Sequence, residues 1–125
     1  MVMPIVREAL ARVLVADIDA ALPIYQKLSG GAAPRRFEFH DVNLAWVGAF
    51  LVLRVPPDQR VHYERTATLL VDNIDDARVT VESCGGVVLE GPADAPNGPR
   101  MIARHEDGAV FEYIQPNSTE PAPKP

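Results

Sequence analysis

The chain has 125 residues, of which 47% are hydrophobic, and its formal net charge is −5. This length supports one hydrophobic core rather than two independent domains, and the acidic balance argues against nucleic acid or an anionic membrane as a partner. A single cysteine, Cys84, excludes an internal disulfide and a cysteine-rich metal site. No apolar run reaches the length of a membrane span and the N-terminus lacks a signal-peptide pattern, so we expect a cytoplasmic protein.

The first predicted elements are a strand over residues 9–15 and a helix over residues 18–28. The strand is rich in β-branched and apolar residues, and Asp17 and Asp19 are candidate helix N-caps. A glycine pair at residues 30–31 ends the helix. Three further strands are then predicted over residues 35–40, 42–47 and 50–55.

The second half of the chain repeats this order. A strand over residues 65–71 leads to a helix over 74–84, which ends at another glycine pair. Strands follow near residues 86–90, 100–105 and 109–115. The turn-rich stretch GPADAPNGP (91–99) is predicted to be a mobile loop, and the proline-rich residues 117–125 a disordered tail.

The two halves also match residue by residue. LVADIDAALPIYQKLSGG (14–31) is echoed by LVDNIDDARVTVESCGG (70–86). Such a repeat predicts two structural copies that face one another and enclose a cleft. We therefore predict an α+β fold in which two βαβββ modules, residues 5–57 and 62–116, form a curved mixed sheet around a cleft within one domain, residues 1–120.

Strand alternation divides the side chains into a set that packs on the helices and a set that faces the cleft. The helix-facing set is predicted to be Ala11, Val13, Val15, Leu51, Leu53, Val55, Ala67, Leu69, Val71, Phe111 and Tyr113. The cleft-facing set is predicted to be Leu10, Arg12, Leu14, Phe50, Val52, Arg54, Thr66, Thr68, Leu70, Val110, Glu112 and Ile114. A register error of one residue in any strand would reverse its assignment.

The paired modules resemble the vicinal oxygen chelate superfamily, which includes glyoxalase I, extradiol dioxygenases, fosfomycin-resistance enzymes and bleomycin-resistance proteins. VLVADIDAALPIYQKLSG is similar to the family's opening strand, Asp turn, aromatic-bearing helix and closing Leu-x-Gly. NLAWVG resembles a strand and turn of bacterial glyoxalase I. HEDGAVFEY (105–113) resembles the family's Asp-Pro-Asp-Gly-Asn-x-x-Glu ending. The resemblance covers roughly residues 8–116 and implies the glyoxalase-like fold.

The family's enzymes usually hold a divalent metal with four inward side chains, two from each module. Those positions fall here on Leu10, Val52, Thr66 and Glu112. Only Glu112 is a competent ligand, because leucine and valine offer no donor atom and a neutral threonine hydroxyl binds zinc or iron poorly. The histidines do not replace the missing donors, since they fall in hairpins or before strands, at His40, His62 and His105. The sequence therefore predicts no metal and no other cofactor.

Glu112 is the best candidate for a catalytic group, although no catalytic residue is assigned. Desolvation in an apolar cleft would make this carboxylate a stronger base. It could equally form a structural ion pair with Arg12, Arg54 or Arg104, or bind a ligand amine. These alternatives stay open at the level of the sequence.

Trp46 and Phe50 flank Gly48 and are candidates for stacking on a planar ligand. The alternative for Trp46 is a place in the core or in a dimer interface. Cys84, at the end of the second helix, is expected to pack in the core as an inert thiol.

The resemblance and the lost ligands together indicate a metal-independent protein of the bleomycin-resistance type. It would sequester a planar or cationic small molecule in the cleft of a homodimer. The predicted ligand-binding residues are Arg12, Leu14, Trp46, Phe50, Arg54, Thr66, Thr68, Arg104 and Glu112. The alternative is a lyase or isomerase of the same superfamily that uses either a metal or Glu112.

Overall fold

The computed structural model of the protein describes residues 4–117, and these form two compact units. The α1 unit comprises residues 11–64, and the α2 unit comprises residues 4–10 and 65–117. Strand β1 (Val6–Val15) contributes to both, because its first half pairs with β5 and its second half with β4. Within residues 4–117, no helix is long and apolar enough to cross a membrane.

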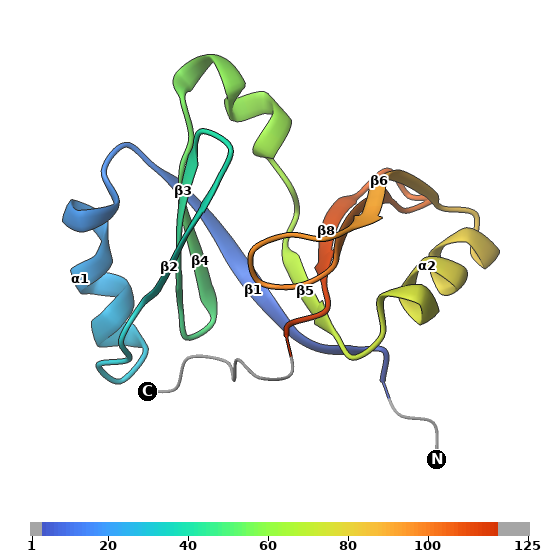
Figure 1. Ribbon diagram of the computed structural model, residues 1–125, viewed down its shortest axis with the longest axis horizontal. Helices are drawn as coiled ribbons and strands as arrows, with labels where there is room; N and C mark the ends of the chain where they lie inside the picture. The colour runs from blue at the N-terminus through green and yellow to red at the C-terminus, as the bar shows by residue number, and fades with distance from the viewer. Residues whose placement is uncertain (1–3, 118–125) are drawn as a thin grey trace. The chain divides into compact units, whose positions relative to one another are not determined.

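The α1 unit contains one helix and a four-stranded mixed sheet, in the order β2-β3-β4-β1. Figure 1 shows α1 lying along one face of these strands. The elements are α1 (Ile18–Leu28), β2 (Arg35–Phe39), β3 (Val42–Val47) and β4 (Phe50–Arg54), with a 3₁₀ helix, η1 (Pro57–Tyr63), after them. β1 and β4 run parallel, although α1, β2 and β3 lie between them in the chain.

The α2 unit repeats this architecture, in the strand order β1-β5-β8-β7-β6, with β5 parallel to β8. Its elements are β5 (Thr68–Val71), α2 (Ile74–Ser83), β6 (Val87–Ala93), β7 (Arg100–Arg104) and β8 (Val110–Ile114). Figure 1 shows α2 against one face of its sheet. The predicted α+β class and the two βαβββ modules are confirmed.

Both helices begin at a capping residue in equivalent places of the repeat. Asp17 accepts a hydrogen bond from the backbone N–H of Ala20 at 3.3 Å, and Asn73 accepts one from Asp76 at 3.0 Å. Each cap satisfies an amide that has no partner inside the helix. The prediction for residues 18–28 is confirmed at both ends, and α2 ends one residue before the predicted position.

β1 begins three residues before its predicted start and β5 three residues after, and two other segments differ from the sequence prediction in kind. The predicted loop over residues 91–99 is wrong at its start, because β6 continues to Ala93, with a register shift between Glu90 and Ala93 that accommodates its glycine and proline. The 3₁₀ helix η1, which begins at Pro57, was not predicted. The predicted tail over residues 117–125 lies outside the described residues except for Asn117.

The predicted faces are correct for β5 and β8. Leu69, Val71, Phe111 and Tyr113 belong to the core under α2, together with Ile74, Ala77, Val81, Met101 and Ala103. Because neighbouring side chains alternate along a strand, Thr68 and Glu112 lie on the other face of that sheet.

The predicted faces of β4 are wrong. Val52 packs with Ile18 and Leu22 of α1 in the core of that unit, and Phe50 lies against the same cluster. Leu51 and Leu53 therefore lie on the face away from α1. The error has a physical cause: residues 51–53 are all at most 2% exposed, so both faces of this strand are apolar and hydrophobicity does not specify a side.

Candidate functional site

A buried polar cluster lies on the face of the α2 unit that is turned away from α2. Thr68 of β5 and Glu112 of β8 are paired in the parallel ladder, which brings their side chains together. The Thr68 hydroxyl donates to Oε1 of Glu112 at 2.8 Å, and Nε of Arg100 on β7 donates to Oε2 at 3.1 Å. Both carboxylate oxygens of Glu112 are thus engaged by protein groups.

The cluster is almost fully removed from solvent. Thr68 is 0% exposed and Glu112 is 8% exposed, while the Arg100 side chain keeps 15% of its surface accessible. Nη1 of Arg100 also lies 3.7 Å from Oε2 of Glu90, so the guanidinium faces two carboxylates. A buried carboxylate is costly unless hydrogen bonds and an opposite charge compensate its lost hydration, and Thr68 and Arg100 provide these to Glu112.

The residues at the family's metal positions do not fit a divalent metal. With β4 corrected by one residue, Leu51 or Leu53 takes the place of Val52, and neither has a donor atom. Leu10 is a buried apolar side chain, and the carboxylate of Glu112 is already held by Arg100. Within the described part of the chain, no three His, Cys, Asp or Glu side chains gather in a way that could hold a metal ion.

The predicted arginines have different surroundings. Nη2 of Arg12 donates to the carbonyl oxygen of Tyr63 at 2.7 Å. Arg104 is exposed and pairs in register with Val110, which places it on the same face as Glu112. Arg54 is exposed at the end of β4 and shares the face of Val52, so its predicted place on the cleft side is wrong.

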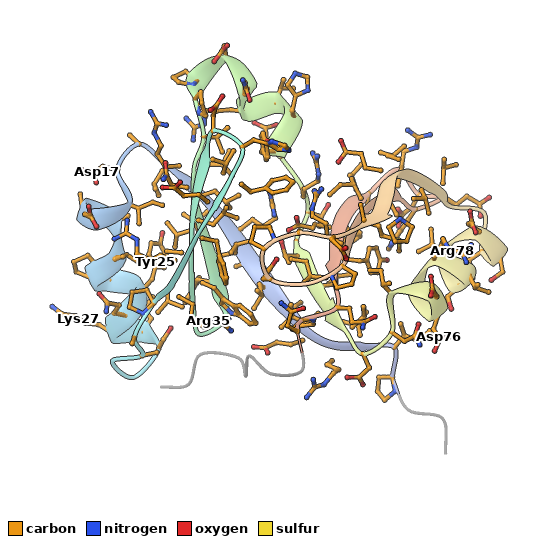
Figure 2. The ribbon with its side chains drawn as sticks, viewed as in Figure 1. Asp17, Tyr25, Lys27, Arg35, Asp76 and Arg78 are labelled. Carbon is orange, nitrogen blue, oxygen red and sulfur yellow. The ribbon has the colours of Figure 1, made fainter. Side chains whose placement is uncertain are left out.

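Trp46 and Phe50 lie on opposite faces of the α1 unit's sheet and do not form a pair. Phe50 packs on Tyr25 of α1 with ring centroids 4.9 Å apart, so it lies on the helix side of the sheet and not on the cleft side where it was predicted (Figure 2 labels Tyr25). Trp46 is 1% exposed, and its indole N–H donates to the carbonyl oxygen of Gly48 at 3.0 Å. The guanidinium of Arg35, labelled in Figure 2, lies 5.6 Å from the Trp46 ring centroid.

The remaining predicted site residues are Leu14, which is half-buried on β1, and Thr66, which is exposed before β5. Arg100 was missed, although it lies on the same face of β7 as the predicted Arg104. The expected burial of Cys84 is wrong, because this residue is exposed and caps the C-terminus of α2. A helix C-cap lies half outside the helix, so apolar periodicity does not apply there.

Neither a protein-family model nor a curated protein sequence matches the chain. An uncharacterised protein from Methanosarcina mazei is 31% identical, with 93% of this chain and 97% of that one covered and a TM-score of 0.84. Methylmalonyl-CoA epimerase from Mycobacterium tuberculosis is 15% identical, with 95% and 94% covered and a TM-score of 0.68.

TnmS3, an antibiotic-binding protein from Streptomyces sp. CB03234, is 22% identical over 92% of this chain and 99% of that one. Its TM-score is 0.38. The similarity to the epimerase shows a common fold, and the similarity to the Methanosarcina protein shows a common family.

Proposed function

We propose that this protein, which shares the fold of methylmalonyl-CoA epimerase and whose motifs resemble the vicinal oxygen chelate superfamily, binds a small organic molecule without a divalent metal. Its role would be that of the bleomycin-resistance type, which sequesters a planar or cationic compound and works as a homodimer. The polar contacts of the ligand would come from Arg104 and from the accessible part of the Arg100 side chain, which Glu112 holds in place on the same face.

One observation carries this proposal: both oxygens of the Glu112 carboxylate are hydrogen-bonded, one to Thr68 and one to Arg100. A metal would have to displace the guanidinium and then find its other ligands among leucines. A general base needs a lone pair directed at the substrate proton, and Arg100 and Thr68 compete for those lone pairs. The same cluster is well suited to binding, because its polar groups are held in place.

The apolar surroundings support a recognition role. Leu70, Ile102 and Ile114 neighbour the cluster on the same face and are all at most 4% exposed. Well-packed apolar side chains in place of a buried ion pair would give equal or greater stability, so folding alone does not require these charges. A few fixed polar groups on an apolar wall are the composition of small-molecule sites.

The test is a thermal-shift screen with planar antibiotics, aromatic acids and cationic glycopeptides, followed by calorimetric titration of any hit. A ligand at a hundredfold excess over its Kd stabilises the folded protein by about 2.7 kcal/mol. Glu112→Gln should weaken a hit about tenfold or more, because the charge-assisted hydrogen bond that positions Arg100 is lost. The exposed Glu38 of β2 gives the matched control, Glu38→Gln, which should leave the affinity unchanged.

A metal series separates this proposal from the enzyme alternative. Protein equilibrated with zinc, nickel, manganese or iron and then desalted should retain far less than one equivalent. One equivalent retained by the wild type and lost in Glu112→Gln would refute metal-independent binding. Turnover of a bound ligand, abolished by Glu112→Gln but not by Glu38→Gln, would instead establish a lyase or isomerase that uses Glu112.

A further inference from the structure

The α2 unit has a hollow on its helix side, away from the Thr68–Glu112–Arg100 cluster. Its volume is about 510 Å³, and it lies between the C-terminal half of α2 and the turn that joins β7 to β8. Val81 and Cys84 line it from the helix, and His105, Glu106 and Tyr113 line it from the strands and the turn. This volume is within the usual range for small-molecule sites.

Glycines after α2 shape the wall of this hollow. A Cβ atom on Gly86 would lie 2.6 Å from Cγ1 of Val81 and 2.9 Å from the carbonyl oxygen of Arg104, so the bare backbone is required there. A Cβ atom on Gly85 would lie 2.7 Å from Oε2 of Glu106. The Glu106 carboxylate therefore lies over the end of the helix rather than extending into solvent away from it.

The floor of the hollow is aromatic, and its polar atoms satisfy each other. The Tyr113 hydroxyl and Nε2 of His105 form a hydrogen bond of 2.5 Å. The His105 ring stacks on Phe111 with centroids 4.5 Å apart and an interplanar angle of 27°. Aromatic faces of this kind attract organic cations more strongly than anions.

The charges around the hollow are negative. Glu106 and Asp107 are exposed at its rim, and the C-terminal end of a helix carries a partial negative charge. The last turn of α2 has no basic residue, whereas the last turn of α1 has Lys27, labelled in Figure 2. Within α2, Arg78 forms ion pairs with Asp75 and Glu82, at 4.0 Å and 3.1 Å.

We propose that this hollow binds a small organic cation, with its ammonium or guanidinium group beside Glu106 and its apolar body against Tyr113 and Val81. The charge that the chain supplies to the end of α1 through Lys27 would be supplied to the end of α2 by the ligand. This site is independent of the function proposed for the opposite face of the sheet.

The only cysteine of the chain, Cys84, lines the hollow and reports on its occupancy. The rate of Cys84 alkylation by neutral iodoacetamide is measured with three probes of similar shape: phenethylammonium, 2-phenylethanol and 3-phenylpropionate. We expect phenethylammonium to slow alkylation with a Kd of roughly 1 mM or below, and the neutral and anionic probes to protect much less. Amide chemical shifts of Gly86 and His105 give a second reading that does not depend on the thiol.

Two variants locate the charge that selects the cation. Glu106→Gln should weaken phenethylammonium binding roughly two- to fivefold, the range for one partly exposed ion pair. Glu38→Gln should leave it unchanged, because Glu38 does not line the hollow. Equal protection by all three probes, no protection and no shift with phenethylammonium, or an equal loss in Glu38→Gln would overturn the proposal.

Discussion

Replacing Thr68 with valine isolates the hydrogen bond to Glu112. Valine has nearly the volume of threonine, so the substitution at this fully buried position leaves no cavity. What is lost is a bond of 2.8 Å to a carboxylate, and Oε1 of Glu112 is then deprived of the donor that compensates its burial. We expect the free energy of unfolding to fall by about 1.5–3 kcal/mol, the range for a hydrogen bond to a charged group.

Urea unfolding followed by far-ultraviolet circular dichroism measures this loss. The midpoint should fall by roughly 1 M for a protein of this size. Thr80→Val, at an exposed position of α2, is the matched control and should change stability by less than about 0.5 kcal/mol. In a Glu112→Gln background Thr68→Val should cost less, because a neutral amide is cheaper to leave without a donor than a carboxylate. Equal losses in both backgrounds, or a loss no larger than that of the control, would refute this account of the cluster.

Three further outcomes are expected. Phe50→Ala should lower the free energy of unfolding by about 2–4 kcal/mol in urea titrations and leave ligand affinity unchanged, because this ring packs under α1; weakened binding in a folded variant would return Phe50 to the site. Gly48→Ala should destabilise more than Gly108→Ala: both have positive φ, but only at Gly48 would a Cβ atom clash, at 2.7 Å from Cβ of Ser29; equal melting temperatures would contradict this. Burial raises the pKa of Tyr113 above its usual value near 10. The neutral side chain therefore makes its full contribution to the free energy of unfolding below about pH 10, and this contribution is lost as the pH rises further. Urea midpoints measured between pH 8 and 11 should therefore fall more steeply for the wild type than for Tyr113→Phe, and parallel curves would contradict the shift.

The sequence predicted the fold well because several local signals agreed. Capping residues, glycine stops and apolar periodicity all placed the two helices, and the internal repeat gave the modular order. Alternation failed in β4, where Leu51, Val52 and Leu53 are equally apolar and equally buried. In β8 it succeeded, because Glu112 between two aromatic residues marks one face as different from the other.

The candidate site was predicted only in part. Thr68 and Glu112 were assigned to one face, and the structure joins them by a hydrogen bond. Arg100 was not selected, because a partner on a neighbouring strand depends on the register between β7 and β8, which no local pattern encodes. The error at Phe50 has the same origin as the error in the faces of β4.

The hollow under α2 reflects a difference between the two copies of the repeat. In the α1 unit only Gly48 and Ala49 join β3 to β4, and the side chain of Ser29 at the end of α1 closes against Gly48. In the α2 unit the corresponding turn spans residues 105–109, and its Gly108 has open space around it. In this longer turn Gly108 lies away from the end of α2, whereas the side chain of Glu106 lies against Gly85 at that end. The gap at one helix and the contact at the other therefore follow from the length of a single turn, and the second copy has room for a ligand where the first is filled by its own cap.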